Sequence, residues 1–176
     1  HTGTRANAET KAAMYTGDQA GWYGADIIQA AIGQSDNKFT PMQMVCYTSA
    51  LANHGVRYKA TFLSRVVSWD YQDLILEHTP TVASELDMSD EAIDCVSTGM
   101  ELAASVGTAA QYLADYPIKL ACKTGTAQWG NEYSGSDHAS FVLYAPADNP
   151  EIAIAVYVEN GGWGAVYGVP IGSLMM

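Results

Sequence analysis

Apolar residues recur every three or four positions in two stretches of the chain, which predicts two amphipathic helices. The first follows Thr40 and Pro41, whose residue types favour an N-cap and the first helical position, and it extends to about residue 52. The second follows Ser89, which suits an N-cap and precedes two acidic residues that favour a first turn, and it ends by Gly107. Two shorter helices are expected over residues 26–32 and 169–176.

β-Branched and aromatic residues gather between the two long helices and predict a hairpin. Its strands are residues 62–69 and 74–76, and residues 70–73 between them have the composition of a turn. Two other segments, residues 1–24 and 161–168, are punctuated by glycine, and we expect them to be mostly loop.

Three further strands are predicted in the last third of the chain, over about residues 118–128, 139–145 and 152–158. The last two are joined by a short turn flanked by prolines, which suits an antiparallel pair. The pattern shows no internal repeat and no second domain. It therefore predicts one α+β domain, in which helices pack on an antiparallel sheet.

The acidic composition restricts the partners of such a domain. A hydrophobic content of 48% in 176 residues suffices for a buried core, whereas a net charge of −11 opposes binding to nucleic acid. The spacing of Cys46, Cys95 and Cys122 fits neither a disulfide framework nor a zinc site, and we expect these residues in the core. No apolar run reaches the roughly 20 residues of a membrane helix.

The clearest chemistry lies in the segment KTGTAQ, residues 123–128. On an edge strand, Lys123 offers a positive charge, Thr124 and Thr126 offer hydroxyl groups, and free N–H groups can stabilise an oxyanion. Gly125 removes a side chain that would keep a ligand from the backbone. Such a segment can hold a carboxylate-bearing acyl donor against a serine nucleophile, although an ordinary surface strand can also contain Lys-Thr-Gly.

The chain, over about residues 24–174, resembles the C-terminal half of the transpeptidase domain of class B, monofunctional, penicillin-binding proteins. Several segments match that family in one order, which is far more specific than any single motif. They are residues 31–34 (AIGQ), 40–44 (TPMQM), 50–55 (ALANHG), 107–109 (GTA), 123–128 (KTGTAQ), 137–141 (DHASF), 144–150 (YAPADNP) and 158–162 (VENGG).

The resemblance implies a role for each residue of the Lys-Thr-Gly segment. Lys123 would belong to the proton and charge network around the catalytic serine. Thr124, Gly125 and Thr126 would form the binding site for the donor, with the two hydroxyl groups on its carboxylate. The backbone N–H of Thr126 would be one half of the oxyanion hole, and the other half would come from a serine that this chain lacks.

Two positions depart from the family pattern. Cys122 stands where the family usually has glycine, and strand alternation points it away from Lys123, into the core. Ser35 stands where the family has the second glycine of "GQG". With Lys38 it satisfies the spacing Ser-x-x-Lys, but the following cap at Thr40 places the pair in a polar loop rather than at a helix N-terminus, so we do not expect it to be catalytic.

The implied parent protein is a peptidoglycan D,D-transpeptidase, whose partners are stem peptides ending in D-Ala-D-Ala, β-lactam antibiotics and the cell-wall synthesis machinery. It would act on the extracytoplasmic face of a bacterial membrane, with no metal or organic cofactor. Residues 1–176 would be the C-terminal portion of its transpeptidase domain, without the upstream Ser-x-x-Lys and Ser-x-Asn elements, and would be inactive alone. A non-catalytic β-lactam sensor or structural cell-wall protein of the same fold is the alternative, and a β-lactamase is disfavoured by the segments TPMQM and YAPADNP.

Overall fold

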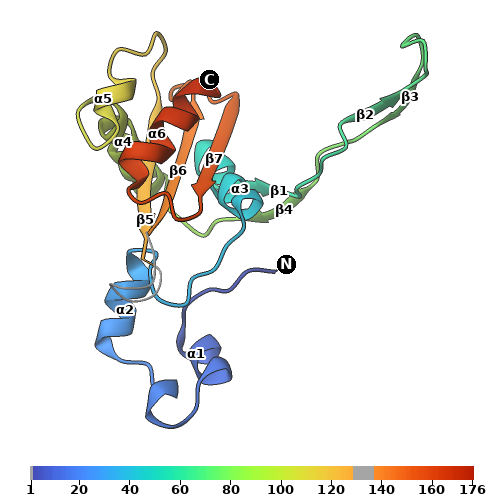
Figure 1. The fold of residues 1–176 in the computed structure, drawn as a ribbon. Helices are drawn as coiled ribbons and strands as arrows, with labels where there is room; N and C mark the ends of the chain where they lie inside the picture. Colours follow the sequence, from blue (N-terminus) through green and yellow to red (C-terminus); the bar gives the residue numbers. More distant parts are fainter. Residues whose placement is uncertain (1, 129–136) are drawn as a thin grey trace.

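A three-stranded antiparallel sheet is the centre of the molecule in the computed structural model, which describes residues 2–128 and 137–176. Its strands are β5 (Ala121–Ala127), β6 (His138–Ala145) and β7 (Ile152–Val158), in the order β5-β6-β7 (Figure 1). All three predicted strands are confirmed, as is the antiparallel pairing of the last two. Within the described residues, β5 has a strand neighbour on one side alone, so its other edge is free.

Helices cover both faces of this sheet, which confirms the α+β class. On one face, α6 (Gly164–Leu174) and the four-residue helix α5 (Ala110–Leu113) pack on a core that includes Phe141 and Leu143. On the other face, the end of α3 (Pro41–Ala52) packs near Tyr144. Burying one such apolar side chain stabilises the fold by roughly 1.5–3 kcal/mol.

The predicted N-termini of the two long helices are confirmed. At α3, the hydroxyl of Thr40 accepts from the N–H of Gln43 at 3.2 Å, and the Gln43 side chain accepts from the N–H of Thr40 at 2.9 Å. This reciprocal pair is a capping box, and Pro41 follows at the first helical position. At α4 (Asp90–Ser105), Ser89 accepts from the N–H of Ala92 at 3.2 Å.

The predicted hairpin exists and is the outer half of a longer two-stranded arm. Its outer strands are β2 (Arg65–Val67) and β3 (Leu74–Glu77), and its inner strands, which the sequence did not reveal, are β1 (Val56–Tyr58) and β4 (Val82–Glu85). Figure 1 shows the arm extending far from the central sheet. Its apolar side chains are largely exposed, and Trp69 near the tip is 93% exposed.

The expectation of loop for residues 1–24 is wrong. The segment contains α1 (Ala8–Met14), the 3-10 helix η1 (Gly17–Ala20) and the start of α2 (Gly24–Ala31). The side chain of Asn7 caps α1 by accepting from the N–H of Thr10 at 2.7 Å. The predicted stop of α2 is correct, since Gly33 follows with a φ of +84°.

The expectation of loop is also wrong for residues 164–168, which form the first half of α6. Gly164, Gly168 and Gly172 recur every four positions and so lie on one face of this helix. A Cβ at Gly164 would clash with the carbonyl oxygens of Gly125 and Ser140, and one at Gly168 would lie 2.8 Å from the Cβ of Phe141. These glycines let the helix backbone approach the sheet closely.

Candidate active site on the free edge of strand β5

The Lys-Thr-Gly segment occupies the half of β5 that emerges from the core. Ala121 and Cys122 at the start of the strand are buried, Lys123 is exposed, and residues 124–127 are half-buried. The register pairs Gly125 with Ser140 of β6. The predicted edge strand is confirmed, and it presents the side chains expected from the sequence.

Lys123 lies beside the free edge of β5, and its ammonium group bonds to the strand's own backbone. Its Nζ donates to the carbonyl oxygen of Thr124 at 2.5 Å. Within residues 2–128 and 137–176, its ammonium group forms no ion pair. It can therefore bind or polarise an anionic group that approaches the edge.

The two threonine hydroxyls are each held by a neighbouring element. Oγ1 of Thr124 lies 2.9 Å from Oγ1 of Thr108, in the turn between α4 and α5. Oγ1 of Thr126 accepts from the N–H of Gly164, the first residue of α6, at 3.3 Å. Thr108 belongs to the GTA segment, so the resemblance pointed to its position, but no role for it was predicted.

The orientation of the peptide groups follows from the antiparallel pairing. The carbonyl oxygens of Thr124 and Thr126 accept from the side chains of Lys123 and Gln34, at 2.5 and 3.0 Å. In an antiparallel strand, the N–H and C=O of a residue point to the same edge. The N–H of Thr126 therefore also points to the free edge, as an oxyanion donor must.

We expected the missing side chain of Gly125 to make room for a ligand, but a side chain of the protein itself lies in that space. A Cβ at this position would clash with Oγ of Ser140, its cross-strand partner. The missing side chain thus makes room for a serine of β6 within the sheet. Ser140 is a residue near the site that sequence reasoning did not single out.

Ser35 and Lys38 do not form a Ser-x-x-Lys site. Ser35 lies in an exposed turn after α2 with a φ of +65°, a left-handed conformation, rather than at a helix N-terminus. The backbone of Lys38 pairs with that of Thr4 in an isolated bridge. The expectation that this pair is not catalytic agrees with its geometry.

Cys122 points into the core, as strand alternation predicted, and its side chain is 0% exposed. Burial raises the pKa of its thiol to about 12, although the nearby charge of Lys123 opposes the shift. A neutral buried thiol cannot act as a nucleophile at neutral pH. The other two cysteines contradict the expectation of core positions, since Cys46 is half-buried and Cys95 is exposed.

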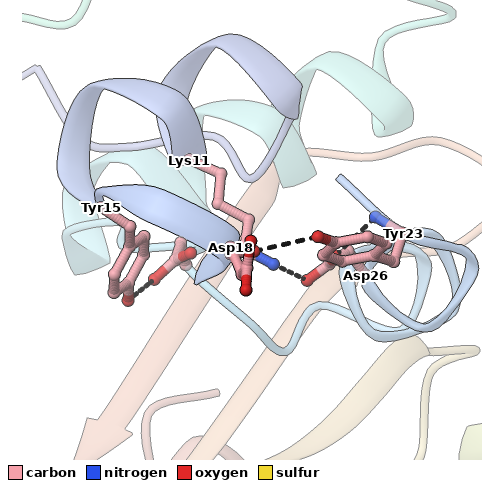
Figure 2. Close-up of polar contacts among 6 residues, drawn as sticks. Lys11, Tyr15, Asp18, Tyr23 and Asp26 are labelled. Atoms are coloured by element: carbon pink, nitrogen blue, oxygen red, sulfur yellow. Dashed lines mark hydrogen bonds and ion pairs between the residues drawn. The ribbon is translucent and has the colours of Figure 1, made fainter. Parts of the chain in front are cut away.

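A network of polar contacts joins the N-terminal helices α1 and α2 to each other (Figure 2). Lys11 forms an ion pair with Asp26 at 2.6 Å, and its Nζ lies 5.5 Å from the ring centroid of Tyr23. The hydrogen bonds from Lys11 and from the N–H of Tyr23 lower the pKa of Asp26. Tyr15 donates to Asp36 at 2.9 Å, which raises the pKa of the tyrosine. In this cluster the positive charge of Lys11 is neutralised by the carboxylate of Asp26, so we interpret the cluster as structural.

Two cavities lie away from the candidate site. One of about 280 Å³ is lined by α4, the end of α5 and the segment that precedes β5, and one of about 790 Å³ lies between α3, the base of the hairpin arm and the turn after β6. Neither is lined by Lys123, Thr124 or Thr126. Among the described residues, no group of three or more side chains suits a metal ion, and no helix is long and apolar enough to cross a membrane.

Comparison with known proteins identifies the family. Residues 6–173 match the model of the penicillin-binding protein transpeptidase domain, so the chain belongs to this family. Within it, the chain is similar to the class B members. Penicillin-binding protein 2A of Bacillus subtilis is 37% identical over 145 residues, which cover 75% of this chain and 20% of that protein. The peptidoglycan D,D-transpeptidase MrdA of Escherichia coli K12 is 32% identical over 162 residues, which cover 84% of this chain and 25% of that protein.

Solved structures show the same similarity in three dimensions. Penicillin-binding protein A of Mycobacterium tuberculosis, in a ceftriaxone acyl-enzyme complex, superposes with a TM-score of 0.74 at 27% identity, covering 89% of this chain and 34% of that one. Penicillin-binding protein 2B of Streptococcus pneumoniae gives a TM-score of 0.73 at 28% identity, covering 89% and 27%. The chain thus spans about a fifth to a third of the proteins that it matches.

Proposed function

We propose that residues 1–176 are the C-terminal portion of the transpeptidase domain of a peptidoglycan D,D-transpeptidase. In this proposal the Ser-x-x-Lys and Ser-x-Asn elements come from an upstream part of the same domain. The observation that carries the proposal is the free edge of β5, where consecutive residues supply the ammonium of Lys123, the hydroxyls of Thr124 and Thr126, and the N–H of Thr126. An edge of this kind can bind an extended acyl donor along its backbone.

Each group has a role in the proposed reaction. The upstream serine attacks the carbonyl carbon between the two terminal D-alanines, and the new C–O bond replaces the C–N bond. The N–H of Thr126 stabilises the oxyanion, and Lys123 stabilises charge and moves protons around the serine. Thr124 and Thr126 bind the carboxylate of the departing D-alanine, which leaves with a proton on its nitrogen. An amine of a second peptidoglycan strand then attacks the ester, restores the serine and completes the cross-link.

The same geometry suits β-lactams, which acylate a serine by ring opening and leave no small departing product. The similar protein from M. tuberculosis has been solved as a ceftriaxone acyl-enzyme, which supports this part of the proposal. The substrates would be stem peptides outside the bacterial membrane, and the partners would be proteins of cell-wall synthesis. The reaction as written requires only side chains and backbone groups.

Labelled penicillin and intact-mass spectrometry test the proposal. Residues 1–176 alone should gain no adduct, because the nucleophile lies upstream, whereas the full-length protein should gain one adduct per chain. In the full-length protein, Lys123→Ala should slow acylation by roughly 100-fold or more, the range typical of a lost electrostatic or proton-transfer group. Lys59→Ala, on the hairpin arm, is the matched control and should leave the rate unchanged. An adduct on Ser35 of residues 1–176 would overturn the proposal.

A further inference from the structure

Gln34 reaches the free edge of β5 from outside the sheet. Its Nε2 donates to the carbonyl oxygen of Thr126 at 3.0 Å, although 92 positions separate the two residues in the chain. The contact is partly buried, and it occupies a backbone acceptor next to the N–H that faces the site. Lys123 donates in the same way to the carbonyl of Thr124, so side chains of this chain occupy the carbonyls of both threonines at this edge.

Hydrogen bonds hold the backbone of Gln34, and they set the position from which its side chain extends to β5. Its N–H donates to the carbonyl of Gln29 at 3.0 Å, and its carbonyl accepts from the side chain of Asn37, also at 3.0 Å. Asn37 in turn donates to Ala30 at 3.2 Å and accepts from the N–H of Ala6 at 2.9 Å. The amide of Gln34 is therefore presented to β5 by an anchored turn rather than by a free loop.

The carbonyl that Gln34 occupies is one that an acyl donor needs. Two residues that face each other as a hydrogen-bonded antiparallel pair exchange both N–H···O bonds. A donor residue whose carbonyl oxygen lies on the N–H of Thr126 therefore brings its own N–H to the carbonyl of Thr126. We infer that Gln34 is a specificity-determining residue, whose amide competes with the N–H of the reacting donor residue for this carbonyl. The inference rests on the proposed function, because it assumes that donors bind along β5.

The competition separates donors by their chemistry. The penultimate D-alanine of a stem peptide has an N–H beside the reacting carbonyl, and so does a penicillin with its acylamino side chain. Such donors must displace the Gln34 amide, and they then gain the hydrogen bond. A carbapenem such as imipenem has a hydroxyethyl group at the equivalent carbon and no acylamino N–H. Its binding should not depend on whether Gln34 occupies the carbonyl.

Acylation kinetics of the full-length protein with benzylpenicillin and imipenem test the inference. Gln34→Met keeps the length of the side chain and removes its donor. For benzylpenicillin, the concentration giving half-maximal acylation rate should fall roughly threefold to tenfold, the effect of one net hydrogen bond, while the maximal rate stays constant. For imipenem, both parameters should stay constant. Gln29→Met, a change of the same kind at an exposed position of α2, should alter neither antibiotic.

The two antibiotics also distinguish a failure of the Gln34 inference from a failure of the proposed function. A constant half-maximal concentration for benzylpenicillin, or an equal shift for both antibiotics, would overturn the role of Gln34. Failure of the unaltered full-length protein to react with either antibiotic would overturn the proposed function instead. If Gln34→Met does not fold, Gln34→Asn replaces it, since its shorter amide withdraws from Thr126, and the same selective shift is expected.

Discussion

The three cysteines of the chain share one chemistry and lie in three environments. Cys122 is buried on β5, Cys46 is half-buried on α3, and Cys95 is exposed on α4. Burial raises the pKa of Cys122 to about 12 because a thiolate is poorly solvated in the core. The residue next to Lys123 is therefore a packing group, and its position in the family motif does not make it reactive.

Alkylation should distinguish these environments. With iodoacetamide at pH 8, native protein should be labelled first at Cys95, while Cys122 stays unlabelled because it is both inaccessible and protonated. In denaturant all three should react at similar rates. Peptide mapping by mass spectrometry gives the order, and labelling of native Cys122 as fast as Cys95 would contradict the burial described above.

Two elements show what a sequence pattern can and cannot predict. The start of α3 was predictable because its signals are local: Thr40, Pro41 and Gln43 lie within four positions. The first half of α6 was missed because its glycines resemble those of a loop, and their reason lies across the fold in Phe141 and Gly125. Glycine destabilises a helix by about 1 kcal/mol per residue relative to alanine. The close packing of α6 against the sheet must therefore contribute more than this cost.

Matched glycine substitutions separate propensity from packing. Gly168→Ala gains helix propensity but drives a Cβ to 2.8 Å from the Cβ of Phe141, and we expect a net loss of roughly 1–3 kcal/mol. Gly99→Ala, in α4, meets nothing within 4 Å and should stabilise by about 0.5–1 kcal/mol. Urea unfolding of the full-length protein gives the change in the free energy of unfolding for each variant. Equal changes for the two variants would refute close packing at Gly168.

The candidate site divides in the same way. Lys123, Thr124, Gly125 and Thr126 were predictable because they are consecutive and chemically distinctive. Gln34 and Thr108 gain their meaning from contacts with β5 over 92 and 16 positions of sequence, and no local pattern reveals such contacts. Resemblance to a family identifies the segments that contain Gln34 and Thr108, whereas only the three-dimensional structure shows which residues they contact.

On the scale of the molecule, stability is unevenly distributed. Strand β6 is paired on both sides, and residues 141–145 within it are buried. In the described part of the chain, the outer strands of the hairpin arm, β2 and β3, pair only with each other, and β3 is exposed along its whole length. An isolated pair of strands is marginally stable in water.

Hydrogen exchange should reveal this contrast. Backbone amides of β2 and β3 should exchange orders of magnitude faster than those of β6, because opening the arm disrupts little packing. Exchange followed by mass spectrometry on peptides from residues 62–77 and 138–145 gives the comparison. Equal protection of the two segments would mean that the arm is covered in solution.

The free edge of β5 also bears on how this protein must be handled. An unpaired strand edge is a template for another strand, including the same strand of a second molecule, wherever its N–H and C=O groups are not already bonded. The open geometry that suits an acyl donor therefore carries a risk of aggregation at high concentration. A bound antibiotic or a covering segment of chain would act as a blocker of fibril-like association, and solubility would improve as occupancy rises.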